Sequence, residues 1–174
     1  MISFFRRLMG TASLLPWAYE DVESDPKALP QALVVVLLSS LATGSLYLDE
    51  AGYPGLAAGV IASLGGWLCW SWLAFHIGTR WFAGPETKAS WGELLRTTGF
   101  ASSPGIVRFA GMVSYEHDLI MGVTAVWMLI AFVLAVRQAL DFRQTWRAVV
   151  VCLAGWVVYA AVLFFLPQAC QLTG

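Results

Sequence analysis

The stretch PQALVVVLLSSLATGSLYL, residues 30–48, contains no charged residue. Its length matches the ~20 residues with which an α-helix crosses the ~30 Å hydrocarbon core of a bilayer. Three more long apolar runs follow, at residues 56–82, 119–136 and 148–166. These runs predict an all-α fold, that of a polytopic helical membrane protein.

The composition of the whole chain agrees with this prediction. Of the 174 residues, 59% are hydrophobic and only 12% are charged, which is about half the charged share of an ordinary soluble protein. The formal net charge is -1, and no basic tail or stripe is present. Proteins that bind nucleic acid gather Lys and Arg on one surface, so we expect no nucleic-acid partner and expect the lipid bilayer as the main surroundings.

Residues 97–115 (TTGFASSPGIVRFAGMVSY) decide how many times the chain crosses the membrane. This segment is only moderately apolar and contains Pro104, Gly105 and Arg108, so hydropathy alone does not settle whether it crosses. The positive-inside rule does, because short cytoplasmic loops collect Lys and Arg and successive loops alternate sides.

If residues 97–115 cross, all the basic residues outside the spans fall on one side of the membrane. They are Arg6, Arg7, Lys27, Arg80, Lys88, Arg96, Arg137, Arg143 and Arg147. If the segment does not cross, the last three move to the other side together, against the rule. We therefore predict about five spans, near residues 30–48, 56–82, 97–115, 119–136 and 148–166, with the third one short or kinked at Pro104.

This topology divides the chain into a cytoplasmic segment, residues 1–29, and a transmembrane domain, residues 30–174. The N-terminal segment has two arginines followed by a short, weak apolar patch and then acidic residues. A signal peptide has a continuous hydrophobic region instead. We expect this segment to stay on the protein as a short interfacial helix, and the C-terminus to be periplasmic.

Small residues recur at near four-residue spacing in the second span, at Gly55, Gly59, Ala62 or Ser63, and Gly66. Such a strip allows another helix backbone to approach closely. We interpret it as packing within the chain, and the alternative is an interface between copies in a homo-oligomer. The nearby Trp67, Trp70 and Trp72 are interpreted as lipid-facing bulk rather than as the lining of a site for an aromatic group or a lipid.

Acidic residues crowd the segment YEDVESDP, at Glu20, Asp21, Glu23 and Asp25. A run of like charges is usually a solvated face, and the alternative is a surface that recruits a basic partner.

The sequence contains no motif that indicates catalysis. The chain contains no GxSxG, Walker or HExxH motif and no pair of carboxylates inside an apolar span. His76 and His117 have no second ligand at metal-binding spacing. We therefore predict a protein that is not an enzyme, with no cofactor and no metal.

Arg108 is the one charged residue inside a proposed span away from its ends, four residues after the helix breaker Pro104. Ionisable residues at this depth are costly and often functional. In the first interpretation, its long side chain extends towards the external headgroups or the acidic loop that follows. In the second, the guanidinium turns inward to carbonyls released at Pro104 or to a partner.

The order of these features resembles the Yip family, the Ypt/Rab-interacting membrane proteins, and in particular its bacterial members. The resemblance is carried by YEDVESDPKALPQAL before the first span, by GFASSP at residues 99–104, by AVRQAL and by TWRAVV. GFASSP is similar to the family's Gly-Tyr-Ser-x-x-Pro element. The resemblance extends from about Tyr19 to Leu166. It implies five membrane helices and a cytoplasmic N-terminus, and it implies no catalytic residues.

Eukaryotic members of that family have a longer N-terminal domain and an Asp-Leu-Tyr-Gly-Pro element, both of which this chain lacks, so their trafficking role is not carried over. We expect a non-enzymatic protein of the bacterial inner membrane that interacts with other membrane proteins as a scaffold, assembly factor or accessory subunit. The alternative is a small solute or ion permease with a polar path near Arg108.

The charge count yields a prediction about topology. Reporters fused after Lys88 or Gln144 should read as cytoplasmic, and reporters fused after Asp118 or Gly174 should read as periplasmic, because the basic loops stay inside. Paired phosphatase and fluorescent-protein fusions measure this directly. A periplasmic signal at Gln144 contradicts five spans.

Overall fold

The computed structural model describes residues 2–45, 48–83, 89–113 and 117–157, and every regular element in them is a helix. In chain order they are α1 (Ile2–Ala12), α2 (Pro16–Ser24), the 3-10 turn η1 (Pro26–Ala28), α3 (Leu29–Ser45), α4 (Leu48–Arg80), α5 (Trp91–Ala101), the 3-10 helix η2 (Ser103–Val113), α6 (His117–Ala139) and the helix Thr145–Val157.

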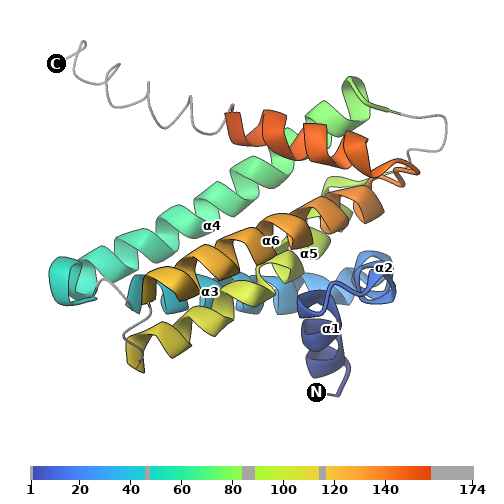
Figure 1. Ribbon diagram of the computed structural model, residues 1–174. Coiled ribbons are helices and arrows are strands. Elements are labelled where there is room, and N and C mark those ends of the chain that lie inside the picture. Colours follow the sequence, from blue (N-terminus) through green and yellow to red (C-terminus); the bar gives the residue numbers. More distant parts are fainter. Residues whose placement is uncertain (1, 46–47, 84–88, 114–116, 158–174) are drawn as a thin grey trace, which may run out of the picture.

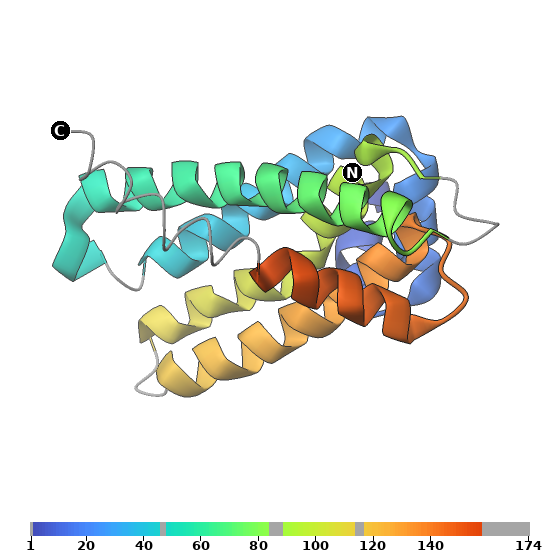
Figure 2. The ribbon, with the colours of Figure 1, turned by 90° about the horizontal axis from the view of Figure 1, so that it is seen from above.

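The long helices extend from one end of the molecule, and α1 and α2 lie together at that end (Figures 1 and 2). The segment η2 packs against both α3 and α6, and α5 packs against α3, α4 and α6. Helices α1 and α2 pack on each other and on α5. The broken segment formed by α5 and η2 is thus in contact with nearly every other element described.

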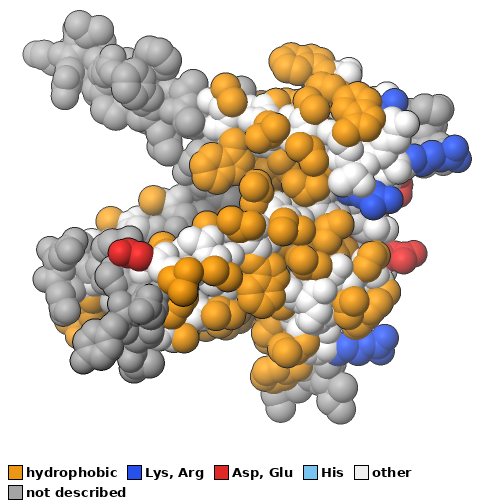
Figure 3. All heavy atoms as spheres, viewed as in Figure 1, with side chains coloured by type: hydrophobic (Ala, Val, Ile, Leu, Met, Phe, Trp, Pro, Cys, Tyr) orange, Lys and Arg blue, Asp and Glu red, His pale blue; other side chains and the backbone are white. Residues whose placement is uncertain are grey.

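Three of the described helices are long and apolar enough to cross a membrane, at Pro26–Ser45, Gly52–Arg80 and Asp118–Ala139. The all-helical membrane fold is therefore confirmed, whereas the count of five spans stays a prediction. The fifth expected span, residues 148–166, lies partly outside the described residues. Figure 3 shows apolar side chains across the middle of one face and most of the charged ones at a single end.

The connection into the second span differs from the expected turn. The sequence predicted a second span that begins near residue 56, but α4 already begins at Leu48 and is broken at Gly52, where φ is 62°. This left-handed conformation is one that glycine adopts without steric cost. Pro54, two residues later, lies at the start of the long helix, where its missing N–H is not needed.

The expected third span, residues 97–115, is not one kinked α-helix. An α-helix, α5, begins earlier, at Trp91, and is started by a capping box in which Ser90 and Glu93 each accept the other's backbone N–H, at 3.3 and 2.7 Å. It ends at Ala101, before Pro104. The chain then continues as η2, whose eleven residues far exceed the 3–4 that are common for this helix type.

Pro104 explains where the helix type changes. Its ring removes a backbone donor and disfavours α-helical geometry at the residue before it. The chain changes to hydrogen bonds between residues three apart at the end of α5. The N–H of Ser102 donates to the carbonyl of Gly99 at 3.2 Å, and the N–H of Gly105 donates to the carbonyl of Ser102 at 3.0 Å. The sequence located the break correctly but not the change of helix type that follows it.

Two of the glycines that allow close contact between helices lie in this broken segment. A Cβ on Gly99 would lie 2.7 Å from the Cβ of Ala32 in α3, and one on Gly105 would lie 2.0 Å from the Oγ of Ser39. At Gly59, by contrast, a Cβ would meet no atom of the described residues within 4 Å. The packing within the chain that we expected at Gly59 is therefore not found in this part of the protein.

This difference gives a stability test with a matched control. We expect Gly99→Leu to lower the melting temperature in detergent strongly, because the side chain would collide with Ala32, and overpacking typically costs ~1–3 kcal/mol or more. Gly59→Leu should melt like the wild type. Thermal unfolding followed by circular dichroism measures both, and equal melting of the two variants would contradict the assigned α3–α5 contact.

Candidate functional site

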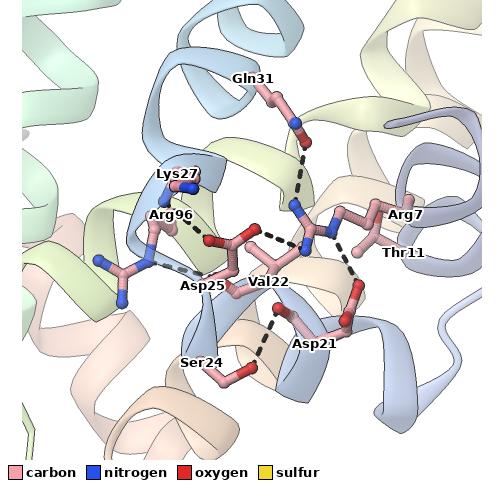
Figure 4. Close-up of polar contacts among 9 residues, drawn as sticks. All are labelled: Arg7, Thr11, Asp21, Val22, Ser24, Asp25, Lys27, Gln31 and Arg96. Atoms are coloured by element: carbon pink, nitrogen blue, oxygen red, sulfur yellow. Dashed lines mark hydrogen bonds and ion pairs between the residues drawn. The ribbon is translucent and has the colours of Figure 1, made fainter. Parts of the chain in front are cut away.

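A buried arginine joins the N-terminal helices to the start of α3 (Figure 4). The Arg7 Nε donates to Asp21 Oδ2 at 2.7 Å, and its Nη2 donates to Asp25 Oδ2 at 2.8 Å. Its Nη1 donates to Gln31 Oε1 at 3.2 Å. The Arg7 side chain is only 8% exposed, and each of the three nitrogens of its guanidinium donates to a protein acceptor. One guanidinium thus fixes α1 against α2, η1 and α3.

A second arginine, Arg96 of α5, holds the C-terminal end of α2. Its Nε donates to the carbonyl of Val22 at 3.2 Å and its Nη2 donates to the carbonyl of Glu23. The last carbonyls of a helix have no partner within the helix, and they carry partial negative charge. A buried cation at this position satisfies both needs and ties α2 to α5.

Two further contacts complete the attachment of the N-terminal helices. The Tyr19 hydroxyl donates to the carbonyl of Thr11 at 2.9 Å, and the Trp127 Nε1 of α6 donates to the carbonyl of Ala12 at 2.7 Å. The C-terminal end of α1 is thereby held by α2 and by a membrane helix. The N-terminal segment therefore forms two short helices docked on the bundle, rather than the single helix that the sequence suggested.

The acidic run is divided by this arrangement into residues with different roles. Asp21 and Asp25 pair with Arg7; the hydrogen bond from Arg7 lowers the pKa of Asp25, and the bond to Asp21 raises the pKa of the Arg7 guanidinium. Glu23 is half-buried, and burial, followed by the nearby Asp141 and Glu93, raises the pKa of its carboxyl to about 7. Glu20 is exposed. The run is thus neither a uniform solvated face nor a continuous acidic surface.

Arg108 lies inside the helix bundle. Its Nε donates to the hydroxyl of Thr124 in α6 at 2.9 Å, and its Nη1 donates to the hydroxyl of Thr43 in α3 at 2.8 Å. These contacts favour the inward interpretation over extension to the headgroups. Both of these acceptors are side-chain hydroxyls, whereas the sequence suggested backbone carbonyls near Pro104. The guanidinium links η2 to both of its neighbours.

A cavity of about 290 Å³ adjoins this arginine. Its lining combines hydroxyl-bearing and aromatic side chains with Arg108. The lining residues are Val36, Ser39, Ser40, Thr43, Ser63, Gly66, Trp67, Trp70, Ser102, Arg108, Met128, Phe132 and Trp156.

The cavity corrects the interpretation of the tryptophan cluster. Trp67 and Trp70 are 9% and 8% exposed, so they are core residues rather than lipid-facing bulk, and only Trp72 is well exposed, at 47%. Of the small-residue strip, Gly66 lines the cavity, Gly55 is half-buried and Gly59 is exposed. Among the predicted residues, the structure thus brings Arg108, Gly66 and Ser63 to this cavity, and it brings Asp21 and Asp25 together at Arg7.

Sequence reasoning missed the residues that complete these sites, above all Arg7, Arg96, Ser39 and the two threonines that bind Arg108. The sequence analysis uses Arg7 and Arg96 only as positive charges that indicate the membrane orientation. Their partners are 14 to 74 residues away in the chain, and no local spacing signals such pairs. A weak signal existed for Thr43 and Thr124, since hydroxyl residues inside apolar helices often bond across helices.

The two neighbouring arginines of α1 allow a matched test of the polar cluster. Arg7→Met should lower the stability by about 2–3 kcal/mol, because it removes charged hydrogen bonds and leaves two carboxylates without their cation. Arg6→Met should have little effect, since the Arg6 guanidinium only stacks on the ring of Trp17, 4.9 Å from its centre. Chemical unfolding in mild detergent compares them. Equal stability would show that Arg7 does not anchor the N-terminal helices.

These two sites contain hydrogen-bond donors, hydroxyls and aromatic rings, and no nucleophile lies beside a base in them among the described residues. A family model for the Yip1 domain matches residues 17–166, which is most of the chain. No curated protein and no solved structure matches it. The range of the match includes Asp21 and Asp25, which bind Arg7, as well as the broken segment and Arg108. The chain therefore belongs to the Yip1 domain family of membrane proteins.

Proposed function

We propose that this protein is a non-enzymatic, five-span protein of the bacterial inner membrane that works by interaction with other membrane proteins, as a scaffold, assembly factor or accessory subunit. Its N-terminus is cytoplasmic and its C-terminus is periplasmic. The observation that carries the proposal is the weak packing of α4 within the chain. Only 17% of its most apolar window is buried, compared with 22% for α6 and 39% for α3.

The exposed side of α4 has the chemistry of a helix-docking face. A Cβ at Gly59 or Gly65 would meet no described atom within 4 Å, so the backbone itself is accessible there. In a bilayer, helices associate through close packing at small residues, because lipid tails are as apolar as the side chains. A helix of another membrane protein therefore fits this face, and a second copy of the chain is the alternative occupant.

The lengths of the elements support five crossings. Helix α5 rises ~16 Å and η2 rises ~22 Å at the standard values for the two helix types, so together they are long enough for a ~30 Å core. The helix Thr145–Val157 supplies the described part of the last span. With five crossings, the basic residues stay on the side of the N-terminus.

The permease alternative has one observation in its favour. The cavity beside Arg108 and the interruption of the helix at Ser102–Pro104 place polar groups near a broken span, as in transporters. The lining of this cavity also contains Trp67, Trp70 and Phe132, which give a solute ion few groups to replace its hydration. We therefore prefer the interaction function.

The test combines purification with a matched pair of glycine variants. The protein is isolated in mild detergent and the co-eluting proteins are identified by mass spectrometry, for the wild type, Gly59→Leu and Gly122→Leu. Both glycines face open space among the described residues, so both variants should fold. We expect the wild type and Gly122→Leu to retain a partner at a fixed ratio and Gly59→Leu to lose it.

Two results would contradict the proposal. A wild-type protein that elutes alone and monomeric from native-abundance membranes has no stable partner. Loss of the partner in Gly122→Leu as well as in Gly59→Leu would mean that the α4 face is not the contact. Uptake of a solute by liposomes that contain only this protein would favour the permease.

A further inference from the structure

Helix α1 lies crosswise to the long helices, at the end of the bundle where most of the charged side chains gather (Figures 1 and 3). In Figure 1 its Ile2 end projects past the neighbouring helices. Its 11 residues rise only ~16 Å, which is too short for a ~30 Å hydrocarbon core. Because the long helices cross the membrane, a short helix placed across their ends lies along the membrane surface.

Helix α1 has two apolar sides, and one of them does not pack on the protein. Phe4 and Leu8 pack against the buried cluster that contains Val22. Phe5 and Met9, in contrast, are 60% and 64% exposed. Since these two residues are four positions apart, they lie on the same side of the helix. A helix in the membrane plane with an exposed apolar side places that side among the acyl chains.

A tryptophan of α2 lies along the neighbouring side of α1. A Cβ on Gly10 would lie 2.9 Å from Cη2 of Trp17, so the missing side chain of Gly10 makes room for the indole ring. The same ring reaches Arg6, one turn earlier, whose guanidinium carbon lies 4.9 Å from the ring centre. Trp17 remains 39% exposed, and tryptophan is enriched at the level of the lipid headgroups.

Arg6 supplies an exposed cation beside this apolar side. Among the described residues, its guanidinium forms no ion pair and donates no hydrogen bond, whereas the next residue, Arg7, is paired with Asp21 and Asp25. A guanidinium can donate two parallel hydrogen bonds to a phosphate group. In Figure 3 the projecting part of the molecule that contains α1 has apolar side chains towards the apolar middle and a basic one on its outer side.

We infer that the outer side of α1 binds the surface of the leaflet nearest the N-terminus, with Phe5 and Met9 among the acyl chains and the Arg6 guanidinium at the phosphate of an anionic phospholipid. The position of α1 favours lipid over a protein partner, because the bilayer surrounds the bundle at the level where the spans end. This inference goes beyond the interaction function proposed above and does not depend on the α4 face that carries it.

The inference is tested on the full chain in nanodiscs that contain equal amounts of phosphatidylglycerol and phosphatidylcholine. The photoreactive residue benzoylphenylalanine replaces Phe5 or Met9, or, as a control, Glu20, which is exposed on α2. After irradiation, intact-mass spectrometry identifies the attached molecule. We expect lipid adducts at positions 5 and 9 and none at position 20.

The same spectra measure the preference for the anionic lipid. We expect adducts of phosphatidylglycerol to exceed those of phosphatidylcholine about fivefold, which corresponds to the ~1 kcal/mol that one basic residue contributes near an anionic surface. Arg6→Gln should remove this preference and keep the adducts, because Phe5 and Met9 remain. Arg147→Gln is the matched control, since the Arg147 guanidinium also lies over a tryptophan ring, 5.8 Å from its centre, but on another helix. It should keep the preference.

Several outcomes would overturn the inference. The absence of lipid adducts at positions 5 and 9, or equally frequent adducts at position 20, would mean that α1 does not lie in the leaflet. Cross-links from position 5 or 9 to another protein, when the experiment is repeated in native membranes, would assign this side of α1 to a protein partner. An unchanged lipid preference in Arg6→Gln, or an equal loss in Arg147→Gln, would remove Arg6 as the headgroup contact.

Discussion

The structure depends on one constraint, that a polar group inside a bilayer has no water to satisfy it. The hydroxyls of the apolar helices meet this constraint locally. Ser40, Thr79, Thr98 and Thr124 each donate to the carbonyl four residues earlier, at 2.6 to 2.8 Å. Because this bond uses the hydroxyl proton, the oxygen remains as an acceptor, and Thr124 can therefore receive Arg108 from another helix.

The same constraint explains why Arg108 and the broken segment occur together. A proline at position 104 ends α5, and the chain continues as a 3-10 helix whose side chains lie between α3 and α6. The guanidinium of Arg108, which lies in this 3-10 helix, donates to hydroxyls of both α3 and α6. A cation placed this way stabilises the position of three elements at once, whereas an apolar residue would leave the contacts non-directional.

Sequence patterns predicted the fold class because apolar runs and a helix-breaking proline are local signals. The contacts of Arg7 could not be predicted from local patterns, since its partners Asp21 and Asp25 lie 14 and 18 residues away in the chain. The burial of Trp67 and Trp70 was also out of reach. Helix α4 is apolar on nearly all sides, so no periodicity tells which face is inside. Spacing likewise identified Gly59 on α4, where no described atom is near, whereas close contacts lie at Gly105, at Gly99 and, on α4 itself, at Gly78.

The long 3-10 helix has a geometric consequence for its contact with α3. Three residues of a 3-10 helix complete one turn and rise about 6 Å, which equals the rise of four residues of an α-helix. Gly105 lies against Ser39, and three residues later Arg108 binds Thr43, four residues further along α3. The two helices therefore advance by equal rises from one contact to the next, although four residues of α3 turn about 40° beyond a full turn, so the contact row shifts slowly around α3. If η2 were α-helical, the same three-residue step would fall about 1.5 Å short and rotate Arg108 by about 60° away from the row that Gly105 occupies.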